Sequence, residues 1–260
     1  SPTYDSANNK IVISYWDSGA DSRGAAVTYS PGGTVTNLTD SNYIGVSTGD
    51  YADGSEATVQ IAGINADQQG MTIGKQYILP DGSLTTDAGY GEDYEVGTPE
   101  VFNNINSTDI SATYDPVNNK VIIAYVDNGN SRYGTVVVGR VSGDSISFGT
   151  PVVFNSADSQ YVTSAYHERA GKTVFVFTER KDGGKAYAIV GTTTGNSVSF
   201  FGSKEQLGSV DGYWPLGASY ICAVYDPVSE RVIVAFQNNF ASPVNGSAVV
   251  GTVNGDSISF

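Results

Sequence analysis

One block of this sequence occurs several times, and that repetition limits the chain to a small group of folds. The segment 114–125, Tyr-Asp-Pro-Val-Asn-Asn-Lys-Val-Ile-Ile-Ala-Tyr, returns at 225–236 with the same order of residue types, and shorter versions begin at Tyr4 and Tyr166. The last three copies each end on a Ser-x-Ser-Phe block, whose phenylalanines are Phe148, Phe200 and Phe260. Their spacings of 52 (200 − 148) and 60 (260 − 200) positions are typical of architectures in which each repeat is one supersecondary unit.

Each copy consists of strand-forming runs separated by turn residues. In the second copy these runs are rich in Val, Ile, Tyr, Phe and Thr, show no helical period, and lie at 110–114, 121–126, 135–141 and 146–154. Four antiparallel strands repeated about every 50 residues describe the blade of a β-propeller. We therefore expect an all-β chain, a β-propeller of four visible blades of ~50 residues. A larger ring or array of such blades and a β-sandwich with similar strands are the alternatives.

The first copy is longer than the others. Tyr4 and Tyr114 are 110 positions apart (114 − 4), against 52 positions (166 − 114) from Tyr114 to Tyr166. We therefore place a small β insert at 36–95, within the first blade, and assign 1–35 and 96–260 to the blades. Strands are expected in the insert at 57–62, at 76–79 and at 43–46.

The insert is strongly acidic. Between positions 37 and 97 there are ten acidic residues and one basic residue, Lys75, so most of the net charge of −14 lies there. We interpret this charge as a solubilising exposed face, with cation binding or docking on a basic partner as the alternative.

The composition of the chain disfavours or excludes several classes of function. Acidic residues outnumber Lys and Arg by 27 to 13, which disfavours binding to nucleic-acid phosphate. No apolar run approaches the ~18 residues of a membrane-spanning helix, so no membrane insertion is expected. The single cysteine, Cys222, excludes an internal disulfide, and the single histidine, His167, excludes sites that need two imidazoles. We expect Cys222 to be buried in a strand and His167 to lie in a surface turn.

Aromatic rings near turns are candidates for contact with a glycan, because a flat ring stacks on the apolar face of a sugar. Tyr213 and Trp214 lie in a Gly- and Pro-containing loop that lengthens the last copy, and Tyr133 and Trp16 lie beside turns. For the loop pair, a packing role at a blade junction is the alternative.

Carboxylates in turns are candidates for Ca²⁺, which takes roughly 6–8 oxygen ligands. Asp17, Asp21 and Asp127 are the candidate ligands. No EF-hand or nonapeptide pattern accompanies them, so solvated turn aspartates are the favoured interpretation, and no other cofactor is expected. The Asp-x-Gly-x-x-x-x-Gly turns at 17–24 and 127–134 are loosely similar to the aspartate-box turns of sialidase-like propellers, where they are structural.

The order of the repeated sequence segments resembles that in a known group of proteins. Its segments are the Tyr-Asp-Pro block at 114–125, Asp-Asn-Gly-Asn-Ser-Arg-Tyr-Gly-Thr at 127–135 and Ser-Ile-Ser-Phe-Gly-Thr-Pro-Val-Val-Phe at 145–154. In this order they resemble repeats in virion proteins of marine tailed bacteriophages, and the insert, at 37–45 and 69–84, resembles the linker module of those repeat arrays. The resemblance implies a tail-fibre-like or virion-surface propeller used for structure or host attachment. It supplies no catalytic residues.

These observations lead to one functional hypothesis and two alternatives. We expect a non-enzymatic structural protein of a virion or surface appendage, located on the virion surface or outside the cell, with an adhesion role toward a host receptor or glycan. Its expected partners are other appendage proteins or copies of itself. The alternatives are a secreted, sialidase-like, glycan-active enzyme of propeller fold and a purely architectural assembly subunit.

Overall fold

The structure is a computed structural model of the chain. It describes residues 2–8, 10–17, 23–29, 97–208, 217–239, 241 and 243–260, and five short strands between positions 36 and 85. The chain divides into two compact units, one made of Ser1–Pro31 with Glu95–Phe260 and the other of Gly32–Tyr94. No helix among the described residues is long and apolar enough to cross a membrane.

The described part of the Gly32–Tyr94 unit consists of two-residue strands in antiparallel pairs. One set pairs in the order β4 (Thr36–Asn37), β7 (Tyr77–Ile78) and β8 (Leu84–Thr85), and the other pairs β5 (Val46–Ser47) with β6 (Val59–Gln60). Strands β6 and β7 lie within the runs expected at 57–62 and 76–79, and β5 begins at the last residue of the run expected at 43–46.

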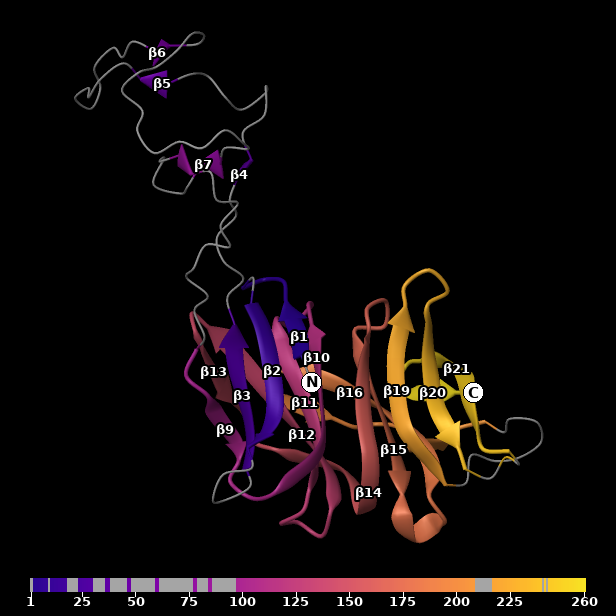
Figure 1. Cartoon of the computed structure of the whole chain (residues 1–260). Coiled ribbons are helices and arrows are strands. Elements are labelled where there is room, and N and C mark those ends of the chain that lie inside the picture. The colour runs from indigo at the N-terminus through magenta and orange to yellow at the C-terminus, as the bar shows by residue number, and fades with distance from the viewer. Residues whose placement is uncertain are drawn as a thin grey trace. The chain divides into compact units, whose positions relative to one another are not determined.

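In the larger unit, each copy of the repeated block forms three antiparallel strands in chain order, and in the first three copies a fourth strand returns to pair with the third (Figure 1). Repeat 1 consists of β1 (Pro2–Asp5), β2 (Lys10–Asp17), β3 (Arg23–Tyr29) and β9 (Glu100–Asn103). Repeat 2 consists of β10 (Ser107–Asp115), β11 (Lys120–Asp127), β12 (Tyr133–Ser142) and the first half of β14 (Val152–His167).

The third and fourth repeats follow the same plan with one difference. Repeat 3 consists of the second half of β14, β15 (Lys172–Glu179), β16 (Lys185–Thr194) and β18 (Glu205–Gln206), with the single-turn 3₁₀ helix η1 (Arg180–Asp182) after β15. Repeat 4 consists of β19 (Ala218–Asp226), β20 (Arg231–Asn238) and β21 (Asn245–Asn254). Among the described strands, none takes the place of a fourth strand in repeat 4.

The expected all-β class is confirmed, with antiparallel sheets throughout the described residues, but one predicted strand is wrong. The run 146–154 is divided into β13 (Ser145–Phe148) and the start of β14. Gly149, Thr150 and Pro151 separate the two, and Pro151 has no N–H with which to continue a ladder. The short strands β13, β17 (Ser197–Ser199) and β22 (Ser257–Ser259) form hairpins with the far ends of β12, β16 and β21.

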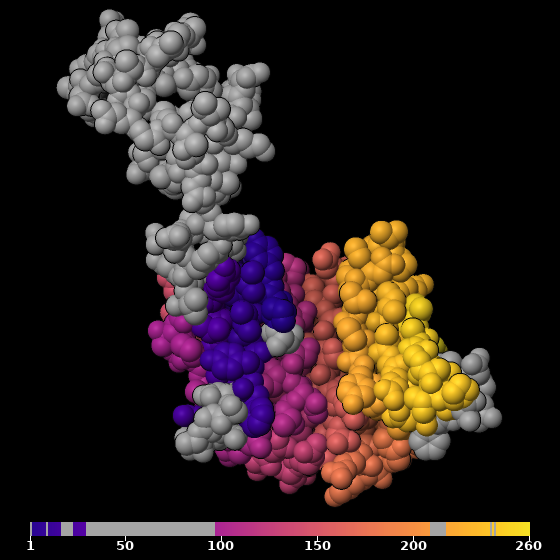
Figure 2. All heavy atoms as spheres, in the orientation of Figure 1, coloured from indigo at the N-terminus to yellow at the C-terminus, as the bar shows by residue number. Residues whose placement is uncertain are grey.

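Adjacent repeats pack face to face through apolar side chains of their second strands. Residues at one set of alternating positions form the forward face, which contacts the following repeat: Val12 in repeat 1, Ile122 and Ala124 in repeat 2, Val174 and Val176 in repeat 3. The other set forms the rear face, which contacts the preceding repeat: Ile123 and Tyr125, Phe175 and Phe177, Val234 and Phe236. In repeats 2 and 3 the second strands are apolar on both faces because both faces are covered. In the space-filling view the repeats follow one another in chain order (Figure 2).

A polar contact accompanies each of these junctions. The lysine that opens the second strand of one repeat reaches the hairpin turn of the next: Lys10 Nζ lies 2.5 Å from Asp144 Oδ1, and Lys172 Nζ lies 2.6 Å from Asp256 Oδ1. At the middle junction Lys120 Nζ donates to Asn196 Oδ1 at 3.1 Å. Because the lysine occupies the same position each time, the junction repeats as regularly as the strands.

The turn between the first and second strands explains the Tyr-Asp-Pro block. The carboxylate of Asp115 accepts hydrogen bonds from the N–H groups of Val117 and Asn118, and Asp5 and Asp226 accept equivalent bonds in their own repeats. In repeat 3 the acceptor is the Nδ1 atom of His167, which receives the N–H of Ala170 at 3.2 Å. His167 is buried, so the expected surface position is wrong: the ring replaces an aspartate that supports the turn from inside.

Candidate functional site

One cavity is lined by the same residue of all four repeats. Its volume is about 430 Å³, and its walls include Tyr4, Tyr114, Tyr166 and Tyr225, the tyrosines that precede the turn acceptors. Because these residues end the first strands of successive repeats, the cavity lies where those strands converge. Its wall is completed by small and polar residues, namely Thr3, Ser6, Thr113, Ser164, Ala165, Glu168, Ala223 and Val224, together with Pro116 and Pro227.

Three of the tyrosines also contact the turn of the preceding repeat. The hydroxyl of Tyr114 accepts the N–H of Ala7 at 3.4 Å and donates to Asn119 Oδ1 at 2.8 Å. Burial raises the pKa of Tyr166, and the nearby carboxylate of Asp115 raises it further. The ring of Tyr225 lies 4.4 Å from that of His167. These three tyrosines therefore lie against the turn of the preceding repeat as well as lining the cavity.

A second repeated feature is a bulge in the first strand of repeats 2, 3 and 4. At each bulge the register shifts, and one non-glycine residue has a positive φ: Asp109 (50°), Tyr161 (50°) and Tyr220 (52°). The side chain of Asp109 accepts the N–H of Tyr161 at 3.1 Å, and the rings of Tyr161 and Tyr220 lie 5.7 Å apart. Such residues are uncommon in strands, and bulges redirect side chains. Because the same bulge recurs in three repeats, these three bulges are a regular feature of the fold and not isolated irregularities.

The half-buried carboxyl of Asp109 predicts a pH-dependent stability. Burial raises its pKa, while the N–H of Tyr161 and the charge of Arg132 lower it less. A raised pKa means that the folded state binds the proton more tightly, so stability is lost as pH rises from the unfolded pKa of ~3.9 through the folded pKa. The variant Asp109→Asn keeps an acceptor for Tyr161 and removes the charge. We expect it to be at least as stable as the wild type at pH 7 in urea unfolding, with its advantage absent at pH 3.

Asp182 provides a control of opposite sign. The hydroxyl of Tyr187 and the ammonium of Lys185 lower the pKa of Asp182, so its contribution is present above the unfolded pKa and lost in acid. Asp182→Asn should therefore be less stable than the wild type at pH 7 and equal to it at low pH. A pH-independent loss of stability in Asp109→Asn would mean that the hydrogen bond to Tyr161 outweighs burial of the charge.

The structure does not bring the predicted glycan-binding residues together with the tyrosine cavity. Trp16, exposed near the end of β2, and Tyr133, half-buried at the start of β12, lie at the strand ends away from the turns that carry the cavity. Tyr213 and Trp214 lie outside the described residues. Sequence reasoning missed the cavity tyrosines as a site, although their recurrence at one position of every repeat was the available signal.

The candidate calcium ligands have other roles where the structure describes them. Asp127 Oδ1 accepts the N–H of Gly129 at 3.0 Å and lies 3.3 Å from the amide of Asn103, so it supports its own turn. The side chain of Asp17 and all of Asp21 lie outside the described residues. In the described part of the chain, no cluster of three or more His, Cys, Asp or Glu side chains is arranged to hold a metal ion.

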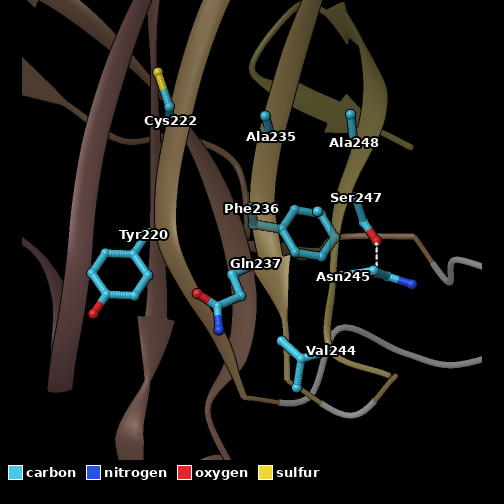
Figure 3. A pocket seen from close by; sticks show the side chains of 10 residues that line it. Tyr220, Cys222, Ala235, Phe236, Gln237, Val244, Asn245, Ser247 and Ala248 are labelled. Atoms are coloured by element: carbon cyan, nitrogen blue, oxygen red, sulfur yellow. Dashed lines mark hydrogen bonds between the residues drawn. The ribbon is translucent and has the colours of Figure 1, made fainter. Parts of the chain in front are cut away.

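A shallow hollow of about 680 Å³ lies over the sheet of repeat 4. It is lined from three neighbouring strands by Tyr220 and Cys222 of β19, Ala235, Phe236 and Gln237 of β20, and Gly246 and Ala248 of β21, among others (Figure 3). Cys222 is exposed here, so the prediction that it is buried is wrong. An alternating strand pattern predicts burial only where another layer covers the strand, and the described residues provide no such layer over this face.

Comparisons of the chain with protein-family models, with curated proteins and with solved structures find no match. The assignment of a function therefore rests on the geometry of the cavity and of the repeat faces.

Proposed function

We propose that the four repeats are blades of the β-propeller type and that the chain is a non-enzymatic structural and adhesion module of a virion or surface appendage, acting outside the cell. The observation that carries the proposal is the cavity lined by Tyr4, Tyr114, Tyr166 and Tyr225. In a propeller, the innermost strands of successive blades face a common axis. Equivalent residues of all four first strands meeting at one cavity are what such an arrangement requires. The resemblance to phage virion repeats supports the proposed location.

The chemistry of the cavity favours a carbohydrate as its ligand. Aromatic rings offer flat apolar surfaces to sugar C–H groups, and the hydroxyls of Ser6 and Thr113 offer hydrogen bonds to sugar hydroxyls. A volume of about 430 Å³ lies in the range of small-molecule sites. A sialidase-like enzyme needs arginines for the substrate carboxylate, whereas Glu168 is the one charged side chain among the described residues of the lining. The cavity therefore favours binding over hydrolysis.

A glycan array with the full chain tests this function. We expect binding to a restricted set of glycans, lowered at least about tenfold in Tyr4→Ala, because Tyr4 is partly exposed and its ring is lost from the wall. Tyr220→Ala, which removes an exposed tyrosine outside the cavity, is the matched control and should bind as the wild type does. Release of sugar from a bound glycan would overturn the non-enzymatic assignment. An array without binding, or equal binding by both variants, would overturn the role of the cavity.

The location is tested separately by electron microscopy of the native assembly with a gold-labelled antibody against the chain. Label on phage particles or appendages supports the proposal, and label confined to the cell interior contradicts it.

A further inference from the structure

The charge at the tyrosine cavity has one sign. Glu168 is the one charged residue in the described part of its wall, which includes no Lys or Arg. Its side chain is exposed and makes no ion pair with a described residue, whereas the neighbouring Arg169 pairs with Glu230 of the next repeat. The lysines that open the second strands reach the hairpin turns of the next repeats instead. No basic side chain of the described wall therefore balances the carboxylate of Glu168.

Further carboxylates lie beside the cavity tyrosines. The turn aspartates Asp5, Asp115 and Asp226 each follow a cavity tyrosine directly in the chain. Hydrogen bonds from the hydroxyl of Ser229 and the N–H of Val228 lower the pKa of Asp226, so this carboxyl is ionised at neutral pH. The surroundings of the cavity thus add negative charge to that of its wall.

The pKa values of two cavity tyrosines reflect this charge. Burial raises the pKa of Tyr114, and the carboxylate of Asp5 raises it further. Burial also raises the pKa of Tyr166, and the carboxylates of Asp115 and Glu168 add to that effect. A carboxylate raises the pKa of a neighbouring phenol because it disfavours a second negative charge. The same field favours a positive charge in the cavity.

Elsewhere this chain holds an ammonium group with a tyrosine and a glutamate. Lys204 Nζ lies 4.6 Å from the ring centroid of Tyr187 and pairs with the carboxylate of Glu179. Burial raises the pKa of Tyr187, and the carboxylates of Asp182 and Glu179 raise it further, as at the cavity. A cation within about 6 Å of an aromatic ring is attracted by the quadrupole of the ring. The cavity combines tyrosine rings with a glutamate in the same way, but the described part of its wall has no lysine.

We propose that the tyrosine cavity selects a cationic sugar, a glycan with a free protonated amine, over the neutral N-acetylated form. The ammonium group lies against the tyrosine rings and donates to the carboxylate of Glu168, while sugar hydroxyls meet those of Ser6 and Thr113. A quaternary ammonium carries the charge but has no N–H group to donate, so the primary amine is the better match for Glu168. This selectivity rests on the proposed function of the cavity as a carbohydrate site and adds the class of sugar.

The test titrates a glucosamine tetrasaccharide and its fully N-acetylated counterpart into the full chain by isothermal titration calorimetry. At about pH 6 and roughly 0.15 M salt, we expect the amine form to bind at least about tenfold more tightly. Glu168→Gln keeps the size of an exposed side chain and removes its charge, and should reduce this preference to about threefold or less. Glu205→Gln, in β18 and outside the cavity, removes the charge of another exposed glutamate and should keep the full preference.

Tyr4→Ala separates the selectivity from the function on which it rests. Weaker binding of both sugars to Tyr4→Ala, together with a preference lost in Glu168→Gln alone, supports the proposal. Equal binding of both sugars by the wild type, weakened by Tyr4→Ala, overturns the selectivity and leaves carbohydrate binding in place. A preference that Glu168→Gln retains, or that Glu205→Gln loses to the same extent, overturns it as well, because the attraction then comes from the acidic chain as a whole. Displacement of the amine sugar by choline more readily than by glucosamine overturns the choice of a primary amine. Binding of neither sugar also overturns the selectivity, and the glycan array then decides the function itself.

Discussion

Phe175→Ala is expected to lower the free energy of unfolding by about 3–5 kcal/mol, the usual cost of removing a large aromatic side chain from a packed core. Phe175 is fully buried at the junction of repeats 2 and 3. Its ring stacks on Phe154 at 5.4 Å and meets the edge of Phe200 at 5.6 Å. The three rings come from β14, β15 and the end of the β16–β17 hairpin. The void left by the substitution would therefore weaken the packing of both repeat 2 and repeat 3. Urea unfolding should show a lower midpoint with an unchanged slope.

Phe201 provides the matched control for this substitution. It has the same side chain but is 73% exposed, so Phe201→Ala should change stability by less than about 0.5 kcal/mol. If both substitutions cost the same, the junction between repeats 2 and 3 would not be the packed core that the contacts of Phe175 indicate.

Gly149→Ala is the second substitution for which a large effect is expected, about 1–3 kcal/mol of destabilisation. A Cβ atom on Gly149 would lie well inside van der Waals distance of the carbonyl oxygen of Asn196, in the hairpin turn of the next repeat. The Cβ atom is fixed to the backbone of residue 149 and the oxygen belongs to the backbone of Asn196, so no side-chain rotation can relieve the clash. Gly97 and Gly202 meet the backbone oxygens of Asp144 and Asp256 in the same way, which makes the close approach a recurring part of each junction. Thermal and urea unfolding measure the loss.

Gly246→Ala is the control for Gly149→Ala. No atom of the described residues lies within 4 Å of its added methyl group, so we expect unchanged stability or a gain of roughly 0.5–1 kcal/mol, because alanine loses less backbone freedom on folding than glycine. An equal loss for the two variants would show that glycine is needed at these positions for its backbone conformation and that the contact with Asn196 is incidental.

Much of the fold follows from local patterns. The Tyr-Asp-Pro block predicts a turn, and Asp115 supports that turn as the side-chain chemistry requires. The runs after it predict strands, and β11 and β12 include the ranges expected at 121–126 and 135–141. These predictions succeed because turn geometry and strand preference depend on neighbours in the chain.

Three predictions failed or were incomplete because they depended on distant residues. His167 is buried since it replaces a turn aspartate and is covered by Tyr225 and Glu230 of the next repeat. Cys222 is exposed because the described residues place no repeat over its face. The cavity tyrosines were visible as a recurring position, but nothing local indicates that four residues spread over the chain line one space.

The sequence alone shows the four repeated blocks with their strands and turns, because these depend on residue identity and spacing along the chain. Its composition alone excludes sites that need a disulfide or two imidazoles. Burial and the location of sites cannot be read from the sequence, because the forward face of the same apolar strand is core in repeat 2 and largely exposed in repeat 4. Which of the two it becomes is decided by the layer packed against it, and only the tertiary structure supplies that layer.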